Sequence, residues 1–506
     1  MIKYKGVDYK NHLGDFRFSK NDLFLMTEES IANKTARTAF WSAIQKIFTM
    51  GVQFVVTMVL ARLLLPTDYG VIALMTVFFA LANSIADCGF SNALIRKDEC
   101  TQEDYSTAFF YNVLVSVGLY LLIFLVAPFV SDFYEIPILC DVMRVSGLIV
   151  IINSVNLVPV VQLTRNLDFK TFALAAVVSS VISGSTGVLM AYWGAGVWAL
   201  VAQSILGSLL SMLIMVYNVR WIPSFSFSKE SFHYLWNFGS KMLLAGIIST
   251  IYANIYSIVI GKCYNSRTLG IYNRGHSLSM LIPDVVNNIF NRNTLPILSQ
   301  LKNEKERMIA VYRKLVVLVS FFNIPLCLLF AALAKPFVLF FLTDKWLDSV
   351  VFLQLFALSA ITSSAGVVNL NIFQAEGRSD ITLKIEVIKK VIGFFIVFVL
   401  LPMGPLVLAI GSMTFNFFCY VVNLYYANKL EHLAFSTQIL DLAPILIASV
   451  VSSIFAYGIT LLELSNFIQL ILGGIVGLMM YVLITKFVIK MDLYDQIFDL
   501  IKNKIK

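Results

Sequence analysis

Four apolar segments of the chain carry polar side chains at helical spacing. The first carries them at Lys46, Thr49, Gln53 and Thr57, and the second at Thr76, Asn83 and Asp87. Two later segments carry them at Lys241, Ser249, Tyr252 and Tyr256, and at Arg274, Ser277, Asp284, Asn288 and Arg292. A charged side chain at mid-bilayer costs at least about 2.5–3.5 kcal/mol, so such residues usually face a cavity.

These residue types suit an anionic headgroup that carries sugars. Lysine offers a point charge to phosphate, arginine offers a bidentate fork, and tyrosine can stack on sugar faces. We therefore predict a cavity whose substrate-binding residues are Lys46, Gln53, Lys241, Tyr252, Tyr256, Arg274 and Arg292. The carboxylates Asp87 and Asp284 are candidates for proton or cation coupling.

A structural reading of the same residues stays open. Lys46 and Lys241 lie about two turns inside one membrane face, where their ammonium groups can reach the headgroups. Asp87 with Lys46, or Asp284 with Arg292, can form structural ion pairs.

Motifs for nucleotide-driven or catalytic chemistry are missing from the sequence. There is no GxxxxGK[ST] loop, and "FGSKM" (238–242) lacks the upstream glycine. HExxH, GxSxG and CxxC do not occur, so we expect no catalytic residues, no cofactor and no metal site. The loops predicted outside the cell do not exceed about 15 residues, too short for a domain that holds a sugar and its catalytic acid.

Composition places these residues in a polytopic membrane protein. Of 506 residues, 58% are hydrophobic and 13% are charged, with a mean hydropathy of +0.81. Soluble domains have about 45–50% apolar and about 25% charged residues. The net charge of +8 fits cytoplasmic loops near anionic headgroups. Nucleic acid is not expected, because no basic run with interleaved aromatic residues occurs.

Apolar runs of about 20 residues predict about fourteen membrane-spanning helices in an all-α fold. In the first half they lie near 38–61, 69–91, 107–129, 139–161, 170–191 and 195–217. In the second half they lie near 239–261, 273–297, 313–334, 347–372, 385–402, 406–428, 438–461 and 466–489. With both termini in the cytoplasm, the inner segments hold about 27 Lys and Arg and the outer loops about 6. The inner segments richest in these residues include 302–314 and 377–390.

Two similar turns indicate an internal repeat. "LLLPTDYGVIAL" follows the first span and "NSRTLGIYNRGHSL" follows the seventh, and each places a glycine before a β-branched residue, at Gly70 and at Gly270. We therefore predict two parallel six-helix lobes and two added helices. The expected parts are a cytoplasmic segment (1–36), N-lobe (37–218), cytoplasmic linker (219–238), C-lobe (239–430), helices 13 and 14 (431–490) and a cytoplasmic tail (491–506).

The first of these turns predicts its own local structure. Pro66 and Gly70 are expected to end one helix and begin the next, with Asp68 capping free backbone N–H groups. Arg62 is expected at the outer interface, where it can reach headgroups or pair with Asp68.

Several stretches resemble Wzx-type polysaccharide flippases of the multidrug/oligosaccharidyl-lipid/polysaccharide (MOP) exporter superfamily. They are "ARLLLPTDYGVIAL", "ADCGFSNALIRKD" (86–98), "RNLDFK" (165–170), "GAGVWALVAQ" (194–203), "LGIYNRGHSL" (269–278) and "EGRSD" (376–380). The resemblance implies a flippase of the bacterial cytoplasmic membrane that moves an undecaprenyl-diphosphate-linked oligosaccharide by alternating access. It implies diphosphate contacts at Lys46, Lys241, Arg274 and Arg292, and a groove for the lipid tail at helices 13 and 14.

The expected partners are the lipid-linked oligosaccharide, membrane lipids, and a polysaccharide polymerase and glycosyltransferases of the same pathway. Two alternative functions remain. One is a multidrug or ion-coupled exchanger of the same superfamily, although an organic-cation pump would favour an acidic cavity. The other is a membrane polymerase or ligase, against which the short outer loops argue.

Overall fold

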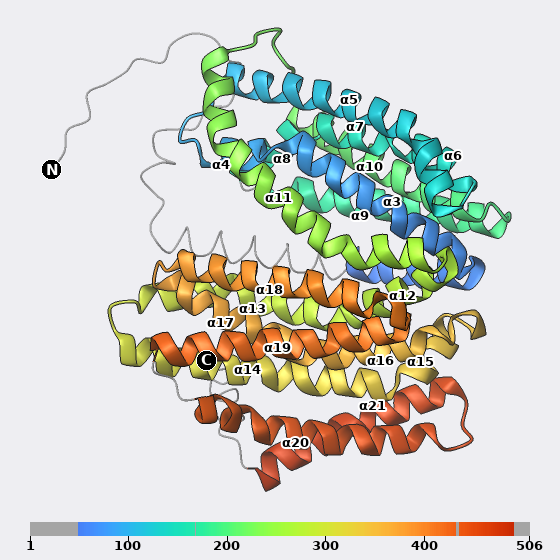
Figure 1. Ribbon diagram of the computed structural model, residues 1–506, viewed down its shortest axis with the longest axis vertical. Coiled ribbons are helices and arrows are strands. Elements are labelled where there is room, and N and C mark those ends of the chain that lie inside the picture. The colour runs from blue at the N-terminus through green and yellow to red at the C-terminus, as the bar shows by residue number, and fades with distance from the viewer. Residues whose placement is uncertain (1–48, 167, 432–434, 490–506) are drawn as a thin grey trace.

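The helices of the computed structural model gather in two bundles with a helical pair attached to the second (Figure 1). The structure describes residues 49–166, 168–431 and 435–489, and this part of the chain contains helices and no strand. Eleven of its helical segments are long and apolar enough to span a membrane. The predicted all-α membrane fold is confirmed, and the count of fourteen spans stays a prediction.

The N-lobe contains helix Thr49–Leu63 and helices α3 to α10. Their bounds are α3 Pro66–Asp87, α4 Phe90–Arg96, α5 Gln102–Tyr134, α6 Ile138–Ser146, α7 Leu148–Val155, α8 Leu157–Arg165, α9 Phe169–Tyr192 and α10 Val197–Val219. The C-lobe contains α12 Ser266–Ser279, α13 Leu281–Gln300, α14 Lys305–Ala332, α15 Ala334–Phe341, α16 Ser349–Ser359, α17 Ser363–Ala375, α18 Ser379–Leu400 and α19 Pro405–Glu431. Short 3₁₀ turns cover 344–346, 360–362 and 401–403.

Helix α11 (Lys229–Cys263) connects the two lobes and contains 35 residues. It packs on α3, α4 and α5 of the N-lobe and on α12 and α18 of the C-lobe. Figure 1 shows α11 crossing from the upper bundle to the lower one. The segment predicted as a linker therefore contributes its second part, from Lys229, to the seventh span, because no helix-ending residue separates the two.

Two predicted spans are broken into shorter helices. The fourth span consists of α6, α7 and α8, with junctions at Gly147 and Asn156, and the eighth consists of α12 and α13, with a junction at Met280. Pro159 and Pro283 each follow a junction by three residues. A proline lacks the N–H group that would continue the hydrogen-bond ladder and its ring clashes with the preceding turn, so the breaks fall just before these residues.

The N-lobe and C-lobe meet where α3 and α12 cross, and we call this end of the molecule the closed end. A Cβ atom on Gly70 would lie 1.8 Å from the Ser266 carbonyl oxygen, and one on Gly270 would lie 1.9 Å from the Pro66 carbonyl oxygen. Each glycine thus packs against the first residue of the other helix. The predicted repeat places its two glycines at one crossing point, which only residues without a side chain can occupy.

The end of helix Thr49–Leu63 adds hydrogen bonds between the lobes at the closed end. Arg62 donates from Nε to the Phe341 carbonyl oxygen at 2.8 Å and from its terminal nitrogen to the Phe340 carbonyl oxygen. Trp346 Nε1 donates to the Ala61 carbonyl oxygen at 2.8 Å. Asp68 accepts from the Leu65 N–H at 2.9 Å and so caps α3 from within its first turn. Arg62 therefore binds the C-lobe backbone, and the expected pairing with Asp68 is replaced by these contacts.

The opposite end of the N-lobe is held by Arg165, the last residue of α8. Its guanidinium donates to the Leu94 carbonyl oxygen at 2.6 Å and to the Asp98 carbonyl oxygen at 2.9 Å. These carbonyl groups lie in the last turn of α4 and beyond its end, where helix carbonyls lack partners within the helix and an arginine can satisfy them. The stretches "ADCGFSNALIRKD" and "RNLDFK" therefore contact each other in three dimensions.

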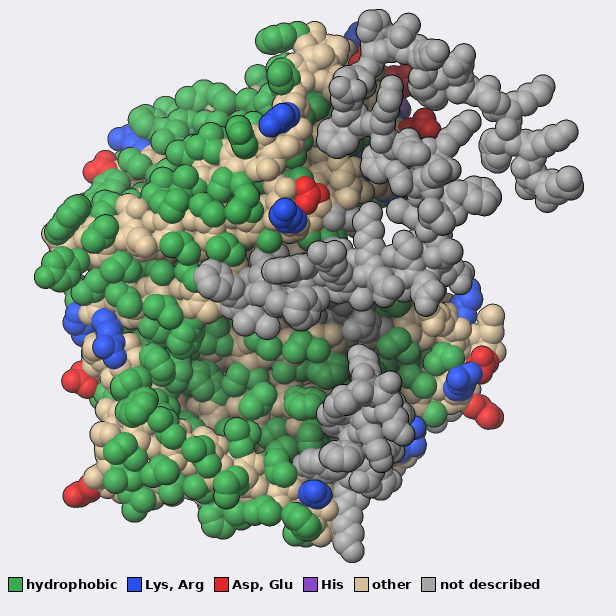
Figure 2. Space-filling model, turned by 180° about the vertical axis from the view of Figure 1, so that it is seen from behind, with side chains coloured by type: hydrophobic (Ala, Val, Ile, Leu, Met, Phe, Trp, Pro, Cys, Tyr) green, Lys and Arg blue, Asp and Glu red, His purple; other side chains and the backbone are tan. Residues whose placement is uncertain are grey.

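Helices α20 (Phe435–Thr460) and α21 (Asn466–Leu483) form an antiparallel pair against α14 and α15. Arg313 of α14 makes a bidentate pair with Asp441 of α20, with N–O distances of 2.7 and 2.8 Å. Figure 1 shows the pair on the side of the C-lobe away from the N-lobe. Hydrophobic side chains cover most of the surface in Figure 2, as lipid contact requires.

Candidate functional site

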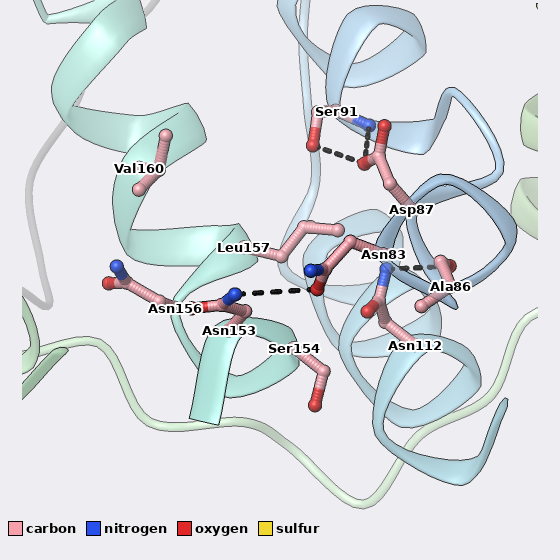
Figure 3. Close-up of a pocket in the computed structure, with 10 residues that line it drawn as sticks. All are labelled: Asn83, Ala86, Asp87, Ser91, Asn112, Asn153, Ser154, Asn156, Leu157 and Val160. Atoms are coloured by element: carbon pink, nitrogen blue, oxygen red, sulfur yellow. Dashed lines mark hydrogen bonds between the residues drawn. The ribbon is translucent and has the colours of Figure 1, made fainter. Parts of the chain in front are cut away.

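A polar pocket lies inside the N-lobe, near the end of α3 that is remote from the closed end (Figure 3). Its volume is about 440 Å³. The lining side chains come from α3, α4, α5, α7 and α8, with Asn156 at the α7–α8 junction: Asn83, Ala86, Asp87, Ser91, Asn112, Asn153, Ser154, Asn156, Leu157 and Val160. Four of the ten are asparagines and one is a carboxylate, which is unusual among helices of this apolarity.

Hydrogen bonds fix several of these side chains without using all their polar atoms. Asn112 Nδ2 donates to the Ala86 carbonyl oxygen at 2.9 Å, and Asn153 Nδ2 donates to Asn83 Oδ1 at 3.3 Å. The buried Asn156 Oδ1 has no partner in the described part of the chain. An amide has two donor hydrogens and two acceptor lone pairs, so capacity remains for hydroxyl groups of a ligand.

Asp87, predicted as a coupling carboxylate, lies in this pocket at the C-terminus of α3. It accepts the Ser91 N–H at 3.2 Å and the Ser91 hydroxyl, and so binds the first turn of α4. Cys88 and Gly89 have left-handed backbones, with φ of 46° and 70°, and turn the chain sharply between the two helices. The carboxylate is half-buried and keeps one oxygen for a further partner.

Tyr252 and Tyr256, predicted as substrate-binding residues, lie one turn apart on α11. The Tyr252 ring packs on Phe394 of α18, with centroids 5.7 Å apart, and the Tyr256 ring stacks on Tyr272 of α12 at 6.2 Å. Both side chains are half-buried. They belong to the contact of α11 with the C-lobe, whereas Asp87 lines the N-lobe pocket.

The structure places Arg274 within the closed end. Its side chain is only 5% exposed and donates to the Thr57 carbonyl oxygen at 2.9 Å. The guanidinium lies over the rings of Tyr69 and Trp346, with centroid distances of 5.1 and 5.6 Å. Protein groups from both lobes surround this predicted substrate contact.

Among the remaining predicted residues, the side chains of Gln53, Lys241 and Asp284 are exposed. Lys46 and the side chain of Arg292 lie outside the part of the chain that the structure describes.

The structure reveals charged residues in α18 that the analysis of sequence stripes did not include. Lys389 is only 9% exposed, and its Nζ lies 3.4 Å from Glu386 Oε1, one turn earlier in the helix. Both residues fell within a predicted span and within a segment counted as cytoplasmic. Their spacing of three residues was the available signal. The pocket asparagines of α5 and α7–α8 were also missed, since none of them forms a stripe within its own helix.

Comparison with known proteins places this architecture in a family. Residues 59–351 match the family described as "Polysaccharide biosynthesis protein". The chain is 26% identical to the lipopolysaccharide biosynthesis protein WzxC of Escherichia coli (strain K12), over 71% of this chain and 74% of that protein. It is 24% identical to the teichuronic acid biosynthesis protein TuaB of Bacillus subtilis (strain 168), over 70% of this chain and 73% of that protein.

Two solved structures share the fold. The lipid II flippase MurJ, in an inward closed conformation, superimposes with a TM-score of 0.71 at 15% identity, covering 88% of this chain and 98% of that one. An inward-facing multidrug resistance transporter of the MATE family and MOP superfamily gives a TM-score of 0.59 at 15% identity, covering 78% and 98%. The fold is therefore that of the MOP transporters, and the chain belongs to the polysaccharide biosynthesis protein family.

Proposed function

We propose that this protein is a flippase for an undecaprenyl-diphosphate-linked oligosaccharide in surface polysaccharide biosynthesis. The observation that carries the proposal is the pocket of amides, hydroxyls and one carboxylate inside helices that are apolar enough to span a membrane. The diphosphate and sugar hydroxyls cannot cross hydrocarbon unaided, because polar groups there lose their hydrogen bonds to water. Membership of the polysaccharide biosynthesis protein family and the similarity to WzxC and TuaB support a substrate of surface polysaccharide biosynthesis.

The transport cycle follows from the closed end. In this conformation the lobes are sealed by the Gly70–Gly270 crossing, by Arg62 and by Arg274. Opening this end while closing the other would carry the headgroup across, with the lipid tail remaining in the membrane. We propose that the closed end faces outward and that both termini lie in the cytoplasm, as the distribution of Lys and Arg predicts.

The roles of the predicted residues form part of this proposal. Lys46, Gln53, Lys241, Tyr252, Tyr256 and Arg292 contact the headgroup during the cycle, and Arg274 becomes available when the closed end opens. Asp87 and Asp284 are the candidate ion-coupling carboxylates. The membrane is the bacterial cytoplasmic membrane, and the pathway's polymerase and glycosyltransferases act on the same lipid-linked substrate.

Deletion of the gene tests the function. We expect the strain to lose surface polysaccharide and to accumulate lipid-linked repeat units, which a membrane-impermeant glycosidase cannot reach from outside. Expression of the protein from a plasmid should restore export. Accumulation of units accessible from outside would instead indicate a polymerase or ligase. A change confined to drug sensitivity would indicate a multidrug exchanger.

A further inference from the structure

Lys389 in α18 differs from the other deeply buried charged residues of the described chain. These are Asp104, Arg274 and Lys389, each less than 10% exposed. Asp104 accepts both Lys97 Nζ contacts at 2.7 Å and the Thr101 N–H, and Arg274 is held between two rings and a carbonyl group. Lys389 has one described polar partner, Glu386, at the long distance of 3.4 Å.

The ammonium group of Lys389 therefore retains unused donor capacity. It has three hydrogens to donate, and the single contact with Glu386 engages at most one of them well. Lys389 is the eleventh of the 22 residues of α18, so it lies at the middle of that helix. Burying a cation costs free energy unless it is paired and hydrogen-bonded, so this position favours an anionic partner.

Glu386 is suited to release the cation because it lies on the more accessible side of the pair. Its side chain is 39% exposed, compared with 11% for Lys389. The 3.4 Å separation is longer than that of a strong charge-assisted hydrogen bond, so the contact within the helix is weak. A diphosphate, which carries more charge and more acceptor oxygens, can therefore compete with one carboxylate for the ammonium.

Tyr252 of α11 lies one turn from Lys389 on the other side. A Cβ atom on Gly393 would lie 2.3 Å from the Tyr252 hydroxyl oxygen, so this hydroxyl points onto α18. It makes no hydrogen bond in the described part of the chain, and Gly393 lies one turn after Lys389 in α18. Lys389, Glu386 and Tyr252 thus form one cluster of a cation, its counter-ion and a free hydroxyl donor.

The two helices separate on the side of the cluster away from the closed end. Leu244, Ile248 and Tyr252 follow one another at four-residue spacing on a single face of α11. Tyr252 contacts α18, but Ile248 is 55% exposed and Leu244 is 66% exposed. The contact between α11 and α18 is therefore short and lies near Tyr252, beside Lys389.

We propose that Lys389 is an anion site for the diphosphate of the substrate. Glu386 occupies this site as an internal counter-ion when no diphosphate is bound. The diphosphate displaces the Glu386 carboxylate from the ammonium, and the Tyr252 hydroxyl donates to a phosphate oxygen. This assignment rests on the proposed function and adds a residue of α18 to the headgroup site.

Binding of inorganic pyrophosphate to the purified full-length protein in lipid nanodiscs tests the site. Calorimetry would compare pyrophosphate with sulfate at matched ionic strength. We expect Lys389→Gln to weaken pyrophosphate binding by about tenfold or more, and Lys389→Arg to retain it, because charge-assisted contacts are lost in one variant and kept in the other. Glu386→Gln should strengthen binding severalfold, since the competing carboxylate is removed. Lys384→Gln, an exposed lysine in the same helix, is the matched control and should leave binding unchanged.

The direction of the Glu386→Gln effect separates this model from a purely structural ion pair. Loss of a structural pair would weaken or leave unchanged the binding of pyrophosphate, and either result overturns the proposal. Unchanged binding in Lys389→Gln, or no binding by the wild-type protein, also overturns it. If Lys389→Gln does not fold, the double variant Glu386→Gln/Lys389→Gln leaves no unpaired charge, and wild-type binding by it would overturn the site.

The result is independent of the gene-deletion experiment. If pyrophosphate binding follows Lys389 but the deletion strain exports polysaccharide normally and no second flippase is present, the anion site stands and the proposed substrate is wrong. If the strain fails to export polysaccharide but pyrophosphate binding is unchanged in Lys389→Gln, the flippase function stands and the assignment of the anion site is wrong.

Discussion

Gly70 and Gly270 occupy equivalent places in the two lobes, and each packs against the first residue of the other's helix. The contacts are with the Ser266 and Pro66 carbonyl oxygens. Because the contact is reciprocal, the crossing of α3 and α12 has the local symmetry of the sequence repeat. The closed end therefore contains two similar turns, one from each lobe, that contact each other.

Substitution of either glycine by alanine should destabilise the closed end. In an open helix, alanine in place of glycine is favourable by about 0.8–1.0 kcal/mol. At this crossing the added methyl group meets backbone, and overpacking of this kind costs about 1–3 kcal/mol. We expect Gly70→Ala and Gly270→Ala to lower the melting temperature in detergent and to reduce export. Gly118→Ala in α5, where a Cβ atom meets nothing within 4 Å, is the control. A rise in melting temperature in either variant would contradict the close crossing.

Arg274→Lys should weaken the same end in a way that separates packing from substrate binding. Lysine keeps the charge but loses the planar group that lies over Tyr69 and Trp346 and donates to the Thr57 carbonyl oxygen. We expect a loss of about 1–3 kcal/mol of stability, read as a lower melting temperature, with pyrophosphate binding unchanged in this conformation. Weaker pyrophosphate binding at an unaltered melting temperature would instead place Arg274 at the headgroup.

The bidentate pair between Arg313 and Asp441 should fasten α20 to the C-lobe. The side chains are 41% and 22% exposed, so water screens them and the contribution is about 1 kcal/mol. Arg313→Gln and Asp441→Asn should each lower the melting temperature, and the double variant should lower it by less than the sum. The exchanged pair Arg313→Asp/Asp441→Arg should recover part of the loss. Strict additivity of the two single variants would show that the pair has no coupling energy.

The N-lobe pocket should be needed for export through both its carboxylate and its amides. Asp87→Asn removes the charge but retains the size, and Asn112→Ala removes the donor to the Ala86 carbonyl oxygen. We expect both variants to reach the membrane at normal levels and to export at most about one tenth as much polysaccharide, as lost charged or buried hydrogen bonds would cause. Thr186→Ala in α9 has an exposed hydroxyl bonded within its own helix and serves as the control. Normal export by Asp87→Asn would exclude this carboxylate from coupling.

The elements that sequence predicts best are those that depend on local pattern. Long apolar runs gave the membrane helices, and the similar turns around Gly70 and Gly270 correctly pointed to equivalent places in the lobes. Arg274 was harder, because its partner Thr57 lies 217 positions earlier in the chain. A polar residue on an apolar helix indicates that its side chain faces a polar partner. Only the tertiary fold decides whether that partner is a ligand or another helix.

Lys389 and Glu386 were missed for a different reason. Lysine and arginine residues near the start of a span are normally assigned to a cytoplasmic loop, and the segment 377–390 was counted as one although it overlaps the predicted span at 385–402. In the structure α18 begins at Ser379, so both charged residues lie within the helix and Lys389 lies at its middle. The pocket asparagines were missed because they converge from separate helices, each of which contributes one or two.

Helix α11 has a mechanical consequence for the whole molecule. A Cβ atom on its Gly239 would lie 2.2 Å from the Cys88 carbonyl oxygen, while Tyr252 is pressed equally closely onto Gly393 of the other lobe. The helix is therefore in close contact with the N-lobe at Gly239 and with the C-lobe at Tyr252. Any rocking of one lobe against the other must bend or twist the roughly three and a half turns between these two contacts, where a Cβ atom on Gly246 would meet nothing within 4 Å. This stretch of α11 is therefore where a relative movement of the two lobes has to be absorbed.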